Sequence, residues 1–234
     1  MNNFSDDTHV VVMGGTAGIG LATARNLSAA GAEVTVTGRD EERLAATKSF
    51  ARPVRVDSTD EAAVHAFLAQ VGRFDHLVLA FSPGAVGLGR LADTPVGDVR
   101  KAFAGKLFPY LHAIRHAQVT GSITMLSAVS ARAALPGTAA LAAVNGAVER
   151  IVSPLAAELA PIRVNAVSPG IVDTSWWDFL PADQRQAQFA SAAATIPAGR
   201  VATPDDVAEA IAYLITATYV TGTILPVDGG ATVA

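Results

Sequence analysis

Short apolar runs alternate with helical patterns along most of the chain. An apolar run starts at His9 and leads through a glycine-rich turn into a segment with Leu21, Ala24 and Leu27 on one helical face, which stops at Gly31. Further strands are predicted over residues 33–37, 54–56, 76–80, 122–126, 162–167 and 223–227, and further helices over 41–50, 60–71, 96–117, 137–159 and 204–216. This order predicts an α/β fold: one doubly wound parallel sheet with helices on both faces.

The segment over residues 174–197 breaks the alternation. It is rich in Trp, Phe, Ala and Gln and has no clear period, so we interpret it as an irregular loop. Loops of this length in compact domains are usually lids or binding segments. We therefore expect a lid over a substrate, contacted by Trp176 and Trp177. The remaining organisation is simple, with a flexible N-terminus over residues 1–8 and a single domain over residues 9–234.

Composition narrows the partners of this domain. Hydrophobic residues make up 50% of the chain and charged residues only 16%, which favours burial against a second copy. The net charge of −4 and the absence of a Lys/Arg cluster argue against binding to nucleic acid or to a membrane surface. There is no cysteine, and no segment has the roughly 18 apolar residues of a membrane span. A cytoplasmic location is expected.

Three glycines follow the first predicted strand. Gly14, Gly18 and Gly20 lie where the strand turns into the first helix. Glycine permits a tight turn and a close approach of backbone N–H groups to a pyrophosphate, whose charge the helix N-terminus favours. Strand, turn and helix in this order predict a Rossmann-type dinucleotide site rather than an ordinary turn with convenient glycines.

Arg39 ends the second predicted strand, about twenty residues further on. An acidic residue here would bind the ribose 2′-hydroxyl of NAD, whereas a guanidinium suits a 2′-phosphate by charge and planar geometry. The cofactor is therefore expected to be NADP(H), with NAD(H) less favoured. The alternative is that Arg39 is a solvated surface residue paired with Asp40 or Glu42.

Together with the rest of the chain, these residues resemble the short-chain dehydrogenase/reductase family. Further matching motifs are Asp57 after the third strand, the run Arg163-Val164-Asn165-Ala166-Val167-Ser168-Pro169-Gly170, and the C-terminal Val227-Asp228-Gly229-Gly230. The resemblance implies a homodimer or homotetramer that binds a small-molecule substrate. The cofactor-binding residues that it implies are Gly14, Thr16, Gly18, Ile19, Gly20, Arg39, Asp57, Asn145, Pro169, Gly170, Val172 and Thr174.

The family's catalytic Asn, Ser, Tyr and Lys are not matched. Aligned without a gap, the stretch from Ser127 to Asn145 places Ala128 at the serine position, Leu141 at the tyrosine position and Asn145 at the lysine position. In the family, the tyrosine phenol exchanges a proton with the substrate oxygen. Leu141 cannot transfer a proton and is instead expected to contact the substrate. Ser127 is retained as a catalytic candidate beside the altered serine position.

One of these departures is compensated by another. The alignment places Lys106 at the family's asparagine position, so the Asn and Lys residue types are exchanged between two helices. A lysine that reaches in from the other helix would bring its ammonium close to the position of the family's catalytic lysine. Lys106 and Asn145 are therefore catalytic candidates. The alternative is a solvated lysine on an exposed helix face.

His112 and His116 are spaced i, i+4 and would share a helix face, as in some metal sites. The sequence shows no obvious third ligand, so we expect no metal and regard this pair as a surface or subunit-interface feature.

Three functions remain open at this point. The first is an atypical NADP(H)-dependent oxidoreductase that reduces a small carbonyl- or imine-type substrate, with a proton from Lys106, a bound water or the substrate itself. The second is an NADP(H)-binding protein without redox turnover, such as a sensor or a pseudoenzyme. The third is a non-redox isomerase or cyclase on the same scaffold.

Overall fold

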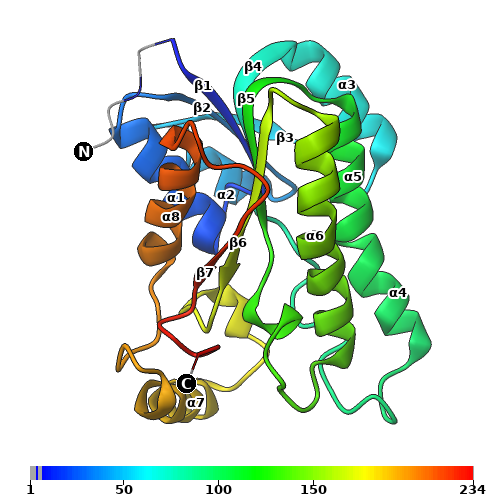
Figure 1. Ribbon diagram of the computed structural model, residues 1–234, viewed down its shortest axis with the longest axis vertical. Coiled ribbons are helices and arrows are strands. Elements are labelled where there is room, and N and C mark those ends of the chain that lie inside the picture. The colour runs from blue at the N-terminus through cyan, green and yellow to red at the C-terminus, as the bar shows by residue number, and fades with distance from the viewer. Residues whose placement is uncertain (1–3, 5–6, 234) are drawn as a thin grey trace.

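Seven parallel strands form the centre of the molecule in the computed structural model, which describes residue 4 and residues 7–233 (Figure 1). Residues 1–3 and 5–6 of the N-terminal segment that we expected to be flexible lie outside the described residues. The strands are β1 (His9–Met13), β2 (Glu33–Gly38), β3 (Arg52–Arg55), β4 (Arg73–Leu79), β5 (Gln118–Leu126), β6 (Arg163–Pro169) and β7 (Ile224–Val227). Their order in the sheet is β3-β2-β1-β4-β5-β6-β7. The predicted fold class is confirmed.

Helices cover both faces of this sheet. On one face lie α1 (Gly18–Ala29), α2 (Glu41–Ala45) and α8 (Pro204–Thr216), and on the other α3 (Glu61–Val71), α5 (Leu107–His116) and α6 (Ala139–Glu158). Alternate residues of β1 point to the two faces. Val10 and Val12 pack in the core under α1 and α8, and Val11 and Met13 pack in the core under α3, α5 and α6. This alternation is the period of two that a strand imposes on its side chains.

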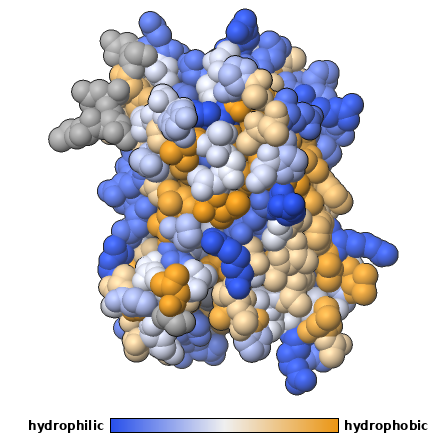
Figure 2. Space-filling model, in the orientation of Figure 1, coloured by the Kyte–Doolittle hydropathy of each residue, from blue (hydrophilic) through white to orange (hydrophobic). Residues whose placement is uncertain are grey.

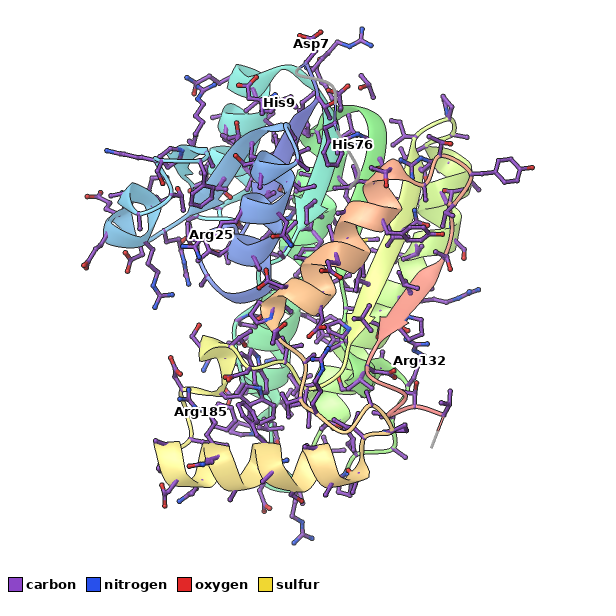
Figure 3. The ribbon with its side chains drawn as sticks, turned by 90° about the vertical axis from the view of Figure 1, so that its left-hand side faces the viewer. Asp7, His9, Arg25, His76, Arg132 and Arg185 are labelled. Atoms are coloured by element: carbon purple, nitrogen blue, oxygen red, sulfur yellow. The ribbon has the colours of Figure 1, made fainter. Side chains whose placement is uncertain are left out.

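The strand order places a crevice at the carboxyl edge of the sheet. The chain leaves β1 toward β2 on one side, whereas β4 pairs with β1 on the other side. Ligands of open α/β sheets bind outside the carboxyl ends of the strands at such a reversal of order. Figure 3 shows α7 (Ala182–Thr195), which carries Arg185, at this end of the molecule, and His9 at the opposite end.

The predicted helix over residues 96–117 is in fact two helices. α4 (Val96–Ala104) ends before Gly105, and α5 begins at Leu107, because Lys106 leaves the helical conformation with φ −137° and ψ −68°. Pro83 packs so closely here that a Cβ on Gly105 would lie 2.6 Å from its Cβ. The apolar pattern continues across the break, which is why periodicity alone joined the two helices.

The prediction of an irregular loop over residues 174–197 was wrong. This segment contains a 3₁₀ turn over Ser175–Trp177 and the 14-residue helix α7. Ala192 is the one buried residue of α7, so the helix has no apolar stripe to reveal it in the sequence. Its alanines and glutamines are good helix formers, and Pro181 precedes its first turn.

Two smaller differences concern element length. α2 ends at Ala45 rather than near residue 50, and β5 begins at Gln118 rather than at residue 122. Within the described residues, none of the helices combines the length and the apolar character that a membrane crossing requires.

Candidate active site

A cleft of about 560 Å³ lies at the carboxyl edge of the sheet. Its walls come from the ends of β4, β5 and β6, from the start of α6, and from the segment after β6. Of the residues expected to bind the cofactor or the substrate, the cleft is lined by Ile19, Leu141, Asn145, Pro169, Gly170, Val172, Thr174, Trp176 and Trp177. Lys106 and Ser127 also line it. Residues far apart in the sequence are therefore brought to one cavity.

The turn between β1 and α1 has the shape of a dinucleotide cradle. Gly14 has φ +84°, a conformation that side chains rarely adopt, and a Cβ there would lie 2.9 Å from the backbone of residues 80 and 81. A Cβ on Gly20 would collide with the carbonyl oxygen of Gly14. Gly18 has φ +49°, and its Cα faces Thr174. The three predicted glycines are thus required by the close packing of this turn.

The N-terminus of α1 fits a negatively charged ligand. Ala17 occupies the cap position and supplies no side-chain acceptor, and the first turn of α1 contains no acidic residue. The backbone N–H groups of this turn consequently lack the side-chain partner that most helix starts have. Such groups, with the helix dipole behind them, suit a pyrophosphate.

Arg39 lies at the end of β2, on the surface beside this cradle. It is exposed, and its carbonyl oxygen accepts a hydrogen bond from Nε of Arg55 at 3.2 Å. The alternative pairing of Arg39 with Asp40 or Glu42 is not observed in the described chain; the Asp40 carboxylate instead caps α2 by accepting from the N–H of Arg43. The guanidinium of Arg39 is therefore available to a ligand.

Asp57 follows β3 near the same edge. Its carboxylate accepts hydrogen bonds from the N–H of Thr59 at 2.9 Å and from the Thr59 hydroxyl at 2.7 Å. The backbone bond is the main reason that the pKa of Asp57 is lowered, and the charge of Arg39 adds to it. Asp57 therefore stays ionised and holds its own turn in place.

Lys106 and Asn145 meet at the floor of the cleft. Lys106 is only 6% exposed, and its Nζ donates hydrogen bonds to Oδ1 of Asn145 at 2.6 Å and to the carbonyl oxygen of Ser127 at 3.4 Å. The amide of Asn145 in turn donates to Oγ of Ser130 at 3.1 Å. The alternative of a solvated lysine is therefore wrong. The break between α4 and α5 is what turns Lys106 toward β5 and α6.

Burial controls the protonation of Lys106. Removal from water disfavours the ammonium form and lowers the pKa of Lys106 to about 7, although the negative charge of Glu149 partly opposes this effect. Both acceptors of Lys106 are neutral oxygens, so no carboxylate forms a direct ion pair with it. A lysine in this state can give up or take a proton near neutral pH.

A second polar cluster braces the floor of the cleft from behind. Glu149 accepts hydrogen bonds from the hydroxyls of Ser127 at 2.9 Å and Ser168 at 2.8 Å. Its other oxygen lies 3.3 Å from Nε of Arg132. Sequence reasoning missed Glu149. The signal that could have found it is its position four residues after Asn145, which puts both residues on the same face of α6.

The chemistry of the cleft is limited by what lines it. Ala128 and Leu141 supply apolar wall, and the remaining polar groups are hydroxyls and amides. Among the described residues that line the cleft, Lys106 is the only one with an ionisable side chain. Of the described side chains that line the cleft, Lys106 is therefore the one that can exchange a proton near neutral pH.

Aromatic residues form another part of the lining of the cleft. Trp176, Trp177 and Phe179 line it, and their ring centroids lie 4.8 to 6.0 Å apart. Nε1 of Trp177 donates to the carbonyl oxygen of Val172 at 3.1 Å, and Phe189 of α7 packs edge-on against its ring. The helix α7 thus supports the aromatic wall from outside.

The two histidines at i, i+4 lie elsewhere. His112 and His116 of α5 both contact the carboxylate of Glu61 on α3, at 3.5 Å and 3.2 Å. No metal-binding group of three such ligands is found among the described residues. This cluster lies outside the cleft.

The chain is similar to known proteins over nearly its whole length. A family model described as enoyl-(acyl carrier protein) reductase matches residues 14–232. The cis-4-hydroxycyclohexanecarboxylate dehydrogenase of Sinomonas cyclohexanicum is 37% identical over an alignment 242 positions long, which covers 95% of each chain.

Two solved structures share the fold of this chain. A small-chain dehydrogenase in complex with NADPH is 32% identical, with a TM-score of 0.84, over 97% of this chain and 100% of that one. A short chain dehydrogenase/reductase family protein is 31% identical, with a TM-score of 0.86, over 100% of both chains. The three matches cover 95% to 100% of this chain.

Proposed function

This chain belongs to the short-chain dehydrogenase/reductase family, and we propose that it is an atypical, NADP(H)-dependent reductase of a small carbonyl- or imine-type compound. The proposed proton donor is Lys106, in place of the family's tyrosine. When bound, the cofactor supplies the hydride, and the chain itself must bind and orient the substrate and deliver a proton to its oxygen or nitrogen.

The observation that carries this proposal is that Lys106 alone among the cleft-lining residues is ionisable, and that its pKa is lowered to about 7. A general acid works best when its pKa lies near the operating pH. The family's tyrosine position, by our alignment, is Leu141, and its serine position is Ala128. Neither side chain can donate a hydrogen bond, so proton transfer must come from elsewhere.

Asn145 and Ser127 act on Lys106 in this proposal. The Oδ1 of Asn145 and the backbone carbonyl of Ser127 hold the amine at the floor of the cleft. The hydroxyl of Ser127 donates to Glu149, which assigns this serine a positioning role rather than contact with the substrate. The exchange of residue types at positions 106 and 145 thus keeps one lysine beside one asparagine.

We propose NADP(H) as the cofactor because the described residues fit it. The uncapped start of α1 and the glycine turn suit the pyrophosphate, and the exposed guanidinium of Arg39 suits a 2′-phosphate. The relative solved with NADPH supports the same choice. Asn145, Pro169, Gly170, Val172 and Thr174 would line the nicotinamide half, whereas Arg39 and Asp57 would face the adenosine half.

Arg39→Ala is expected to weaken NADPH binding while leaving NADH binding nearly unchanged. A lost charge-assisted contact to a phosphate is worth about 1.5–3 kcal/mol, or roughly 10- to 150-fold in Kd. Titration of both cofactors against wild type and variant measures this, with Arg43→Ala as an exposed control on α2. Equal affinities of the wild type for the two cofactors would contradict the assignment.

The aromatic wall is proposed to cover the substrate. Trp176 and Trp177 are the chain's two tryptophans, and both line the cleft. Tryptophan emission therefore reports on this cleft alone. A panel of carbonyl and imine compounds, screened by emission for binding and by NADPH oxidation for turnover, tests the proposed function. Binding without turnover for every compound would leave the second function below as the better one.

The second candidate is an NADP(H)-binding protein without redox turnover. Leu141 and Ala128 favour it, since the cleft then lacks the usual proton donor and would serve only to hold ligands. It differs from the first candidate in one respect that can be measured: NADPH binds, and no carbonyl or imine compound accelerates its oxidation.

Assembly into a homodimer or homotetramer is part of the proposal. Apolar side chains gather along the side of the molecule formed by α6 (Figure 2). On the neighbouring helices, Val96 is 66%, Phe108 48% and Leu111 38% exposed. Contiguous exposed apolar patches mark interaction sites. Sedimentation at micromolar concentration should show a dimer or a tetramer.

A further inference from the structure

We propose that Lys106 is also a nucleophilic amine, and that the cofactor-free protein captures aldehydes and unhindered ketones reversibly as an imine on its Nζ. This activity does not depend on hydride transfer, so it can exist whether or not the protein is a reductase. The ligand class is a carbonyl compound with an apolar body.

The hydrogen bonds of Lys106 leave one direction of its nitrogen free. A neutral amine has two N–H groups and one lone pair. The oxygens of Asn145 and Ser127 accept the two N–H groups, at 2.6 Å and 3.4 Å from Nζ. Lys106 also lines the cleft, and the lone pair takes the one tetrahedral direction of Nζ that neither the side chain nor the two acceptors occupy. The amine is therefore held in place as a nucleophile.

The surroundings of Nζ favour the neutral form of the amine. The carboxylate of Glu149 accepts hydrogen bonds from two serine hydroxyls and forms an ion pair with Arg132. It does not contact Lys106. At pH 7, a lysine whose pKa is about 7 is roughly half neutral, whereas a solvated lysine is neutral in only about one molecule in a few thousand. Desolvation of this kind is how proteins activate amines for imine formation.

The cleft gives a carbonyl compound room to reach this amine. The side chains at 128 and 141 are alanine and leucine, and neither offers a group that would compete for the carbonyl oxygen. The aromatic wall of Trp176, Trp177 and Phe179 lines the same cleft and suits an apolar body. A benzaldehyde-sized compound is small compared with a cavity of about 560 Å³.

The step balances without any redox partner. The Nζ lone pair attacks the carbonyl carbon, one C–N bond forms, and the carbonyl π electrons move to oxygen as it takes a proton. The carbinolamine then loses the hydroxyl and the nitrogen's proton as one water, which leaves the C=N bond of the imine. Addition of water reverses the sequence and releases the carbonyl compound.

The experiment traps the imine chemically. The cofactor-free protein is incubated at pH 7 with benzaldehyde and sodium cyanoborohydride, which reduces the imine to a stable benzylamine, and labelled residues are identified by peptide mass mapping. The chain has three lysines, Lys48, Lys101 and Lys106, of which the first two are exposed. They and the amino terminus serve as internal controls.

Lys106 is expected to be labelled at least about tenfold faster than Lys48 or Lys101, a conservative figure given the larger difference in neutral amine. The rate should fall as the pH is lowered from 7 to 5, because the amine becomes protonated. Lys106→Arg keeps a cation and removes the nucleophile, so it should lose the fast label, whereas Lys101→Arg should keep it. Circular dichroism of both variants checks that they fold.

Labelling of Lys106 no faster than that of the exposed lysines, in a protein whose tryptophan emission shows that benzaldehyde binds, would overturn the inference. That result leaves the reductase proposal intact, because NADPH oxidation is measured separately. Conversely, fast labelling of Lys106 without any NADPH turnover would sustain the imine site and count against the reductase.

Discussion

Replacing Lys106 by methionine is expected to lower NADPH-dependent kcat by about 10²- to 10⁴-fold, the usual contribution of a general acid. Methionine has a similar length and is apolar, so it fills the same space in the floor of the cleft without a proton to give. NADPH affinity should stay close to that of wild type if the lysine serves the substrate oxygen. The measurements are steady-state kinetics and a cofactor titration on the same preparations.

The side effects of this variant can be separated from its effect on catalysis. Loss of Lys106 leaves Oδ1 of Asn145 without its donor, which costs about 1–3 kcal/mol of stability for a buried acceptor. Thermal unfolding reports this cost, and Lys101→Met, at an exposed position of α4, is the matched control. An equal loss of cofactor binding would assign Lys106 to the cofactor, and unchanged turnover would remove it from the mechanism.

Replacing Gly20 by valine is expected to abolish cofactor binding at concentrations that saturate the wild type. Even the Cβ of the new side chain would collide with the carbonyl oxygen of Gly14, and it would lie 3.2 Å from Cβ of Ala80. The first of these is backbone and cannot swing aside. If the turn opens at a cost of about 3 kcal/mol or more, the affinity falls by more than about a hundredfold.

Gly97→Val is the control for this variant. A Cβ on Gly97 would meet nothing within 4 Å, and the residue lies near the start of α4. Its substitution should leave both cofactor affinity and the melting temperature nearly unchanged, since valine tolerates a helix at least as well as glycine. Isothermal titration with NADPH, well below the melting temperature, decides the comparison. Full affinity in Gly20→Val would mean that the turn is not the cradle.

The sheet and the cradle could be predicted because their signals are local. Apolar runs bounded by turn residues located all seven strands, and the spacing of Gly14, Gly18 and Gly20 located the turn after β1. Such patterns depend on neighbours in the sequence, so a single chain suffices. The family resemblance then supplied the order of the motifs, from Asp57 to the C-terminal glycines.

The break at Lys106 and the helix α7 could not be predicted in the same way. The apolar period runs on through Gly105, and the kink is visible only once Pro83, from a distant loop, packs against that glycine. In α7 a single buried residue, Ala192, gives no period at all. The break at Lys106 depends on a tertiary contact, and α7 depends on helix propensity alone. The hydrophobic pattern contains neither signal.

The polar floor of the cleft was predicted in part. Alignment paired Lys106 with Asn145, and the structure places them 2.6 Å apart. The cluster around Glu149 was missed, because Ser168 and Arg132 reach it from β6 and from the segment after β5, and no sequence spacing joins them. The protonation of Lys106 likewise depends on how completely these elements exclude water.

The dependence of the single-turnover rate of NADPH oxidation on pH tests the central claim most directly, with the rate measured at saturating cofactor and carbonyl substrate. Lys106 must be protonated to act as the acid, and its pKa is lowered to about 7. The rate should therefore be highest below pH 7 and fall about tenfold for each further pH unit above it. In Lys106→Arg, which stays protonated throughout, the slow residual rate should not change with pH. A wild-type rate that is the same from pH 6 to pH 9, or a variant that follows the wild-type curve, would contradict the account.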